Sequence, residues 1–412
     1  MANRGLTVVY ILCVWFVISF VTNIIGPLMP VLIGDFHLNL ALAGFLPFSF
    51  FLAYGLVSIP AGALIETRGP SFSLLTALSV NLTGALLFAL HPTYLAGVAA
   101  LFIIGAGMAM LQVIINPLMR MAGGETHFAF YSVLGQLVFG LASYLSPAVF
   151  SVIMTRNSSL PGVLTALTTM FHAPHWALLY WLFALLFLLT IGLTFAINLK
   201  SFSLNADERA EPIGVYLSLM RNRTALLYFF GIACYVAMEQ SIANWMSAFL
   251  QTYHGIDPTT VGAQEVGDFW GLMSVGCLIG LGLLKLLDSK VVLCGAVICA
   301  ALSLAAALFG ATQFSLVAFP LCGLFLSVMF SIVFSLGLNS LPNNHGALSG
   351  ILCSGIVGGA FGPLLVGAVG EHLGLRLAYL LVFAFMAFLF VIGICAKPLV
   401  KNQTVFQTSQ HT

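Results

Sequence analysis

Charged side chains are scarce in this sequence. Only 6% of its 412 residues are Asp, Glu, Lys or Arg, whereas 61% are hydrophobic. Soluble domains carry about 25% charged residues, so an ordinary soluble domain is excluded. The net charge of +1 provides no basic face for a nucleic-acid partner. The composition therefore predicts a polytopic membrane protein whose surroundings are lipid.

Metal-binding and disulfide motifs are missing as well. The eight cysteines lie inside apolar segments, without a C-x-x-C pair or a histidine at metal-ligand spacing. We interpret them as small hydrophobic residues and predict no metal and no cofactor other than a coupling ion. A membrane enzyme would need paired carboxylates, a His/Asp set or a metal site, and a receptor would need a soluble domain. The stretches between apolar segments are too short for such a domain, so we expect no enzyme and keep both classes only as remote alternatives.

Long apolar runs fill most of the chain. With about 20 apolar residues needed for one membrane span, twelve helices are predicted. They cover 6–33, 41–65, 72–90, 94–119, 128–154, 175–197, 223–250, 263–287, 290–309, 314–341, 347–369 and 374–396. The expected fold is all-α, with twelve transmembrane helices in two six-helix halves around a central cavity.

A charged break at 198–222 separates six helices from six. We therefore divide the chain into an N-terminal half (1–197), a linker (198–222), a C-terminal half (223–396) and a tail (397–412). Placing the N-terminus in the cytoplasm puts eleven Lys and Arg residues on the cytoplasmic side and two outside. The positive-inside rule then predicts cytoplasmic termini in a bacterial inner membrane. We expect a monomer in contact with membrane lipid.

One carboxylate lies deep in an apolar run. Glu239 is near the middle of the stretch from Thr224 to Leu250, too far from either end to reach water easily. Gln240 and Asn244 fall on a neighbouring arc of the same helix. A buried acid that only fixes helix packing is one interpretation, and a coupling group or substrate ligand is the other. This polar face predicts a polar interior.

Amide side chains recur on other helices. Gln112 and Asn116 are one turn apart on the fourth helix, Gln136 lies on the fifth, and Asn23 lies one turn after Ser19 on the first. Carboxamides offer the donors and acceptors that sugar hydroxyls require. An interhelical hydrogen bond explains one such pair equally well, but several stripes together predict a lined cavity.

Two tryptophans lie within predicted helices and away from their ends. Trp245 and Trp270 could stack on the C–H face of a sugar ring, or they could pack in the protein core. A buried indole N–H needs a hydrogen-bond partner in either case. Both residues are therefore candidate site residues.

Several stretches resemble a known family. LQVIINPLMRMAG (Leu111 to Gly123) resembles the L-Q-V-A-A-N-P-Y-V segment of the fucose/glucose/galactose permease family of the major facilitator superfamily. GIVGGAFGPLLVGAVGEHLGL (Gly355 to Leu375) is similar to that family's I-V-G-G-A-x-x-P-L-x-G segment. YVAMEQSIANW (Tyr235 to Trp245) resembles the seventh-helix pattern of its sodium-dependent glucose transporter-like members.

The resemblance implies a sugar transporter with a central site between the halves. It supports Gln112 and Asn116 on the fourth helix, Gln136 on the fifth, and Glu239 with Trp245 on the seventh. The chain also departs from proton-coupled relatives, with Ile25-Gly26 where they have Asn-Asp and Gln112 where they have Glu. Glu239 is then the carboxylate left for coupling.

These observations predict a secondary active transporter that imports a hexose or related sugar by alternating access. Glu239 would carry H⁺, or would hold Na⁺ together with Asn244; sodium is slightly favoured by the seventh-helix likeness, and uncoupled diffusion is a third mode. An exporter of sugars or amphipathic compounds is the alternative function, since aromatic residues also suit apolar solutes.

Overall fold

The computed structural model describes residues 4–123, 128–155, 174–197, 213–342 and 345–399. Within these ranges the protein is helical and contains no strand. Twelve of the described helical segments are long and apolar enough to cross a membrane. The predicted all-α fold with twelve spans is confirmed.

In the described part of the first half, six helical elements form six spans. They are α1 (Arg4–Thr22), α2 (Ile25–Asp35), α3 (Leu40–Leu90), α4 (Tyr94–Gly123), α5 (Phe128–Thr155) and α7 (Ala177–Ala196). The first span joins α1 to α2, and α3 supplies two spans, Leu40–Ile65 and Thr67–Leu90.

A short helix, α8 (Ile213–Met220), lies inside the predicted linker. The spans that follow are built from α9 (Arg223–His254), α10 (Val261–Leu286), α11 (Ser289–Phe309), α12 (Thr312–Leu326), α13 (Met329–Leu338), α14 (His345–Ser354), η4 (Gly355–Val357), α15 (Gly358–Leu373), α16 (Leu375–Ala378) and α17 (Leu380–Cys395). The three boundaries predicted between the halves, the linker and the tail remain predictions.

Four spans predicted as continuous helices are interrupted, the twelfth at Tyr379, between α16 and α17. The first breaks between α1 and α2, where Pro27 lacks the N–H that would bond to the carbonyl of Asn23. The tenth breaks at Ser327, whose hydroxyl bonds the carbonyl of Leu324 over 2.7 Å. The eleventh passes through η4, a 3₁₀ turn next to glycines. Local backbone chemistry therefore overrides the uniform hydropathy of these segments.

Helix α9, which carries Glu239, has defined ends. Asn222 precedes it, and the Asn222 side chain accepts hydrogen bonds from the backbone N–H groups of Thr224 (2.8 Å) and Ala225 (3.3 Å). The helix ends at Gly255, whose φ of 65° is the left-handed conformation that glycine adopts at low cost. These two caps fix the register of a helix of 32 residues.

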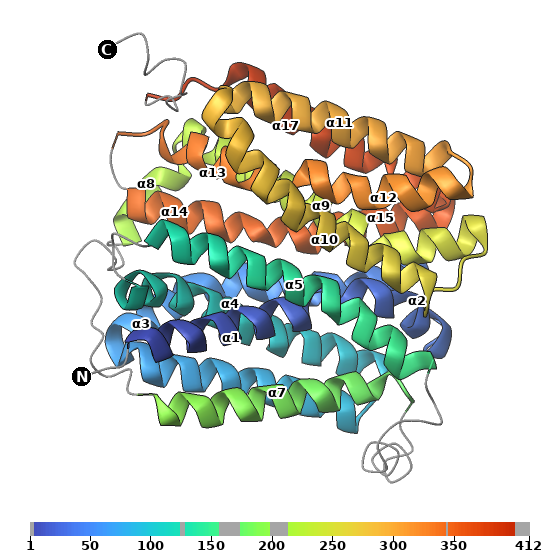
Figure 1. Cartoon of the computed structure of the whole chain (residues 1–412), viewed down its shortest axis with the longest axis horizontal. Helices are drawn as coiled ribbons and strands as arrows, with labels where there is room; N and C mark the ends of the chain where they lie inside the picture. The colour runs from blue at the N-terminus through green and yellow to red at the C-terminus, as the bar shows by residue number, and fades with distance from the viewer. Residues whose placement is uncertain (1–3, 124–127, 156–173, 198–212, 343–344, 400–412) are drawn as a thin grey trace.

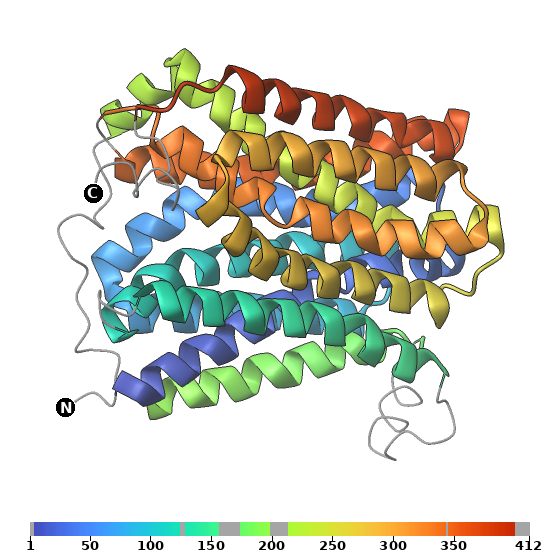
Figure 2. The same ribbon diagram turned by 45° about the horizontal axis from the view of Figure 1, so that its top comes forward.

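The two halves lie on opposite sides of the bundle. Figure 1 shows blue-to-green helices below and yellow-to-red helices above, and the turned view in Figure 2 keeps this division. The halves pack through α3 on α15, α5 on α10 and α2 on α9. Helix α1 begins and α17 ends at the left of Figure 1. We call this the terminal end of the bundle and the opposite one the far end.

Candidate functional site

A cavity of about 540 Å³ lies between the two halves. Its walls come from α1, α3, α4 and α5 on one side and from α9, α10 and the α12–α13 break on the other. This volume is in the range of about 300–1,000 Å³ that is usual for small-molecule sites. The halves therefore enclose a site that neither contains alone.

The cavity reaches from the middle of the bundle toward the terminal end. On α10 its lining starts at Trp270 and continues to Leu284, near the end of that helix. On α5 the lining runs from Tyr131, near the start of the helix, to Ser143. Exposed side chains such as Gln136 and Leu281 are part of the lining. The cavity is thus open toward the terminal end.

The far end is closed by close contacts between the halves. A Cβ built on Gly26 would lie 2.4 Å from the carbonyl oxygen of Ala243, and one built on Gly367 would lie 2.5 Å from that of Leu40. The backbone N–H of Leu40 also donates to Oε2 of Glu371 over 2.8 Å. Only glycine permits such approaches of two helix backbones.

Glu239 is half-buried and lines the cavity. The hydroxyl of Tyr235, one turn earlier, donates to its Oε1 over 2.8 Å, and Nε2 of Gln240 donates to its Oε2 over 3.4 Å. Nδ2 of Asn244 in turn donates to Oε1 of Gln240 over 3.1 Å. Among the residues that the structure describes, Glu239 has no basic side chain as an ion-pair partner. The carboxylate is therefore held by neutral donors at the cavity wall.

Asn23 lines the opposite wall, at the α1–α2 break. Its Nδ2 donates to the hydroxyl of Ser143 on α5 over 2.8 Å. Ser19 and Ser143 share a hydrogen bond of 2.6 Å, and Ser19 also bonds the carbonyl of Phe139 over 2.6 Å. This cluster fixes α1 against α5 and so sets the direction of the Asn23 amide.

Two further predicted amides lie in the same cavity. Gln112 accepts a hydrogen bond from the hydroxyl of Tyr54 on α3, and both residues line the wall. Gln136 is exposed nearer the mouth. Asn116 lies on α4, but its side chain is outside the described residues. The predicted stripe on the fourth helix is therefore represented in the described cavity by Gln112.

The two candidate tryptophans have different surroundings. Trp270 lines the cavity, and its buried indole N–H has no hydrogen-bond partner among the described residues. Trp245 is fully buried outside the cavity lining, and its Nε1 donates to the carbonyl of Pro363 over 2.9 Å. Asn244 also lies outside the lining, behind Gln240. The expected contact of Trp245 and Asn244 with substrate is thus not provided in this conformation, because their side chains point into the packed bundle.

Several lining residues were not singled out from the sequence. Tyr54, Trp15, Tyr131 and Phe330 contribute aromatic surface, but aromatic residues in an apolar segment carry no signal that separates the cavity from the core. Tyr235 could have been found, because it precedes Glu239 by one helical turn.

A second buried carboxylate lies outside the cavity. Glu265 on α10 is 8% exposed, and its Oε2 has no hydrogen-bond partner within the described residues. It is four residues after the start of its helix, so it is about 6 Å from that end. Glu239 therefore remains the carboxylate of the central cavity, and Glu265 belongs to the far part of the second half.

The cavity combines neutral amides, hydroxyl groups and aromatic rings with one carboxylate. Such a surface can bind an uncharged polyhydroxylated molecule through hydrogen bonds and ring stacking. Twelve spans in two halves, with a site open toward one end and closed at the other, define a secondary transporter that works by alternating access.

Comparison with known proteins gives the family. Residues 11–355 match the family model of the Major Facilitator Superfamily. The chain is 30% identical over 403 residues to the glucose/galactose transporter of Brucella abortus, covering 95% of each chain. It is 26% identical over 388 residues to the L-fucose-proton symporter of Escherichia coli, covering 88% of this chain and 87% of that protein.

A solved structure shares the fold. The crystal structure of the E. coli fucose:proton symporter superimposes with a TM-score of 0.67 at 22% identity, over 95% of this chain and 98% of that one. The protein belongs to the major facilitator superfamily, in the group that includes the Brucella glucose/galactose transporter. These relatives are transporters and not enzymes.

Proposed function

We propose that this protein is a cation-coupled importer of a hexose of the glucose and galactose class. The observation that carries the proposal is the carboxylate of Glu239, which lines the central cavity between two neutral donors and has no basic partner among the described residues. A charged group at membrane depth is costly unless it binds an ion or a substrate.

The substrate class is supported by the chemistry of the cavity wall. Asn23, Gln112 and Gln136 offer amide groups for hydroxyls, and Trp270 offers an indole N–H that has no partner among the described residues. Among the described lining residues no Lys or Arg is present, so an anionic substrate would lack a counter-charge. The names of the Brucella and E. coli relatives point to the same class of neutral sugars.

The surroundings of Glu239 favour H⁺ over Na⁺ as the coupling ion. Tyr235 and Gln240 turn hydrogens toward the two carboxylate oxygens, whereas a metal cation needs several oxygen lone pairs. Asn244, the expected second ligand, turns its amide nitrogen to Gln240. The described residues contain no group of three or more acidic, His or Cys ligands. Protonation of Glu239 would neutralise its carboxylate before the protein passes through its closed conformation.

The orientation follows from the charge count. In the predicted topology eleven of the thirteen Lys and Arg residues of the sequence fall on the side of the termini, which supports a cytoplasmic terminal end. The conformation described here is then inward-facing, with the periplasmic side closed at Gly26 and Gly367. We further propose that the protein acts as a monomer in the bacterial inner membrane, since the site is complete within one chain.

Counterflow and gradient-driven uptake in proteoliposomes test the proposal. Labelled glucose or galactose should exchange without a gradient and should accumulate when a pH gradient is imposed. Accumulation driven only by a Na⁺ gradient would assign sodium instead. The absence of sugar flux under every gradient would overturn the proposed function.

Glu239→Gln separates the roles of this carboxylate. We expect the variant to retain counterflow and to lose accumulation, because the carboxamide keeps the shape of the side chain but cannot take up and release a proton as a carboxylate does. Loss of sugar binding would make Glu239 a substrate ligand, and unchanged accumulation would leave it a packing role. Asp257→Asn, at an exposed position where the amide oxygen can still accept from the backbone N–H of Thr259, is the control for general loss of a carboxylate.

A further inference from the structure

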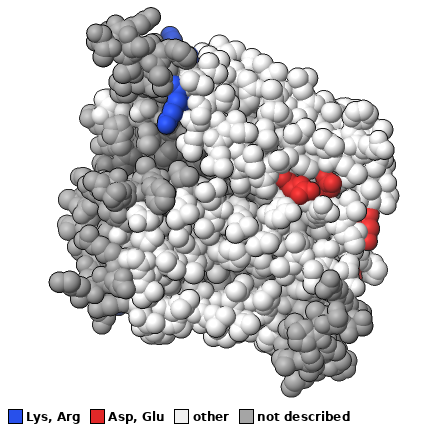
Figure 3. Space-filling view, viewed as in Figure 1, with Lys and Arg blue, Asp and Glu red and all other residues white. Residues whose placement is uncertain are grey.

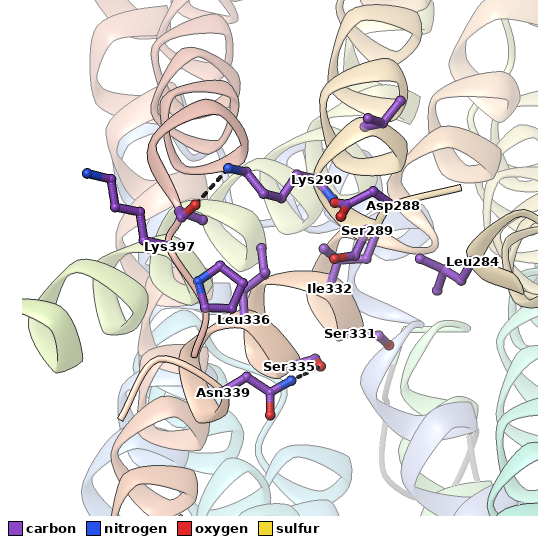
Figure 4. A pocket seen from close by; sticks show the side chains of 13 residues that line it. Leu284, Asp288, Ser289, Lys290, Ser331, Ile332, Ser335, Leu336, Asn339 and Lys397 are labelled. Carbon is purple, nitrogen blue, oxygen red and sulfur yellow. Dashed lines mark hydrogen bonds between the residues drawn. The ribbon is translucent and has the colours of Figure 1, made fainter. Parts of the chain in front are cut away.

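A second cavity lies at the terminal end of the second half, outside the transport site. Its volume is about 590 Å³. The end of α10, the turn into α11, the helix α13 and the chain after α17 form its walls (Figure 4). We call it the lysine pocket, after Lys290 and Lys397 at its edge.

The two lysines are at the ends of membrane spans. Lys290 is the second residue of α11, and Lys397 follows the end of α17 by two residues. Nζ of Lys290 donates to the carbonyl oxygen of Ala396 over 2.7 Å, which holds the chain after α17 against the start of α11. Two ammonium groups therefore lie at the level where lipid headgroups begin.

The acidic side chain that lines this pocket already accepts a hydrogen bond. Asp288 caps α11, and its Oδ1 accepts a hydrogen bond from the backbone N–H of Lys290 over 2.8 Å. The described lining residues thus contain two cations and one engaged anion. Figure 3 shows how charged side chains are distributed over one face of the protein: basic groups lie toward the terminal end and acidic groups toward the far end.

The opposite edge of the pocket is polar but neutral. Ser331 and Ser335 on α13 and Asn339, the C-cap of that helix, follow one another at intervals of four residues, and Figure 4 shows them across from the lysines. Nδ2 of Asn339 donates to the hydroxyl of Ser335 over 3.3 Å, and both serines are exposed.

The floor and outer rim of the pocket are apolar. Ile332 and Leu336 are buried between the polar edge and the lysines. Val291 at the rim is 59% exposed, and it is the third residue of α11, which forms a candidate membrane span. The lysine pocket thus joins a cationic, hydroxyl-lined surface to an apolar exit.

We propose that the lysine pocket binds the headgroup of an acidic phospholipid of the adjacent leaflet. The phosphate would lie against the ammonium groups of Lys290 and Lys397, a polar headgroup would reach the hydroxyls of Ser331 and Ser335, and the acyl chains would leave past Val291. Charge complementarity with an anionic leaflet and the position at the span ends identify the lipid as the ligand.

The proposed lipid would contact the wall of the transport cavity. Leu284 and Ser331 line both the lysine pocket and the central cavity. A lipid in the lysine pocket would therefore brace α10 against α13 beside the open mouth. This inference rests on the second half alone and holds whatever substrate the central cavity accepts.

Native mass spectrometry of the purified full chain tests the inference. Phosphatidylglycerol and phosphatidylcholine with identical acyl chains are titrated separately, and we expect tighter binding of the acidic lipid. Lys397→Gln leaves the Lys290–Ala396 bond in place and should weaken phosphatidylglycerol binding about fivefold, and Lys290→Gln with Lys397→Gln about 25-fold.

Lys285→Gln is the matched control, because Lys285 is exposed on α10 but does not line the pocket. It should leave lipid binding unchanged. Equal binding of the two lipids, equal losses in the control and pocket variants, or no loss in any pocket variant would overturn the proposal. Displacement of the lipid by millimolar inorganic phosphate would also overturn it, by assigning a site for free anions.

Discussion

The hydroxyl of Tyr235 donates a hydrogen bond of 2.8 Å to Oε1 of Glu239, one turn along the same helix. This bond fixes the direction of the carboxylate that the described lining residues contribute to the central cavity. Because donor and acceptor share a helix, the bond is independent of how the two halves move.

Tyr235→Phe removes this donor and keeps the ring. A hydrogen bond to a charged group contributes about 1.5–3 kcal/mol, so we expect gradient-driven sugar accumulation to fall about tenfold while counterflow changes less than about twofold. Uptake into proteoliposomes with and without an imposed gradient measures both quantities. Tyr10→Phe, which removes a buried hydroxyl bonded to Thr194 of the first half, should alter neither. An equal loss of counterflow and accumulation would contradict the positioning role.

Gln112→Ala removes an amide from the cavity wall and leaves the hydroxyl of Tyr54 with only the longer bond of 3.5 Å to the carbonyl of Met108. The loss of about one hydrogen bond to a sugar hydroxyl should raise KM for uptake about tenfold. Gln251→Ala, at an exposed position on α9, is the control and should leave KM unchanged. A normal KM for Gln112→Ala would remove this residue from the proposed site.

Replacement by Phe is expected to have different effects at the two tryptophans. Trp270→Phe removes the unpartnered N–H at the cavity and should weaken sugar binding about three- to tenfold, with little change in Tm. Trp245→Phe breaks the bond to Pro363 inside the bundle and should lower Tm while sugar affinity is kept. Sugar titration and thermal unfolding of the purified variants measure both effects. The reverse pattern would place the sugar near Trp245.

Gly26→Ala tests the closure of the far end. The added methyl group would lie 2.4 Å from the carbonyl oxygen of Ala243, so the two helices would have to separate. We expect slower transport by about tenfold or more and slower maleimide labelling of Cys277, a cavity residue, from the terminal end in membrane vesicles.

Gly34→Ala is the matched control on the same helix, because nothing lies within 4 Å of a Cβ at that position. It should transport and label at normal rates, and Cys277→Ser identifies the labelled thiol. Normal transport by Gly26→Ala would contradict the contact as a feature of the working cycle.

The sequence alone determined the class of this protein and the number of its spans. The length of an apolar run and its content of charged residues are local properties of the sequence. Together they decide whether a segment can span a bilayer of fixed thickness. The same argument singled out Glu239, because a carboxylate far from both ends of an apolar run is unusual wherever the helix packs. Amide stripes on several helices similarly predicted a polar cavity, and Asn23, Gln112, Gln136 and Gln240 line it.

The tertiary structure decided which side chains face that cavity. Trp245 and Trp270 were equivalent candidates in the sequence, yet one bonds Pro363 in the bundle and the other lines the site. The rotation of a helix about its axis is set by contacts with both halves, which are distant in sequence. The helix breaks, the contact between Gly26 and Ala243 and the lysine pocket likewise depend on backbones that meet only in the folded protein.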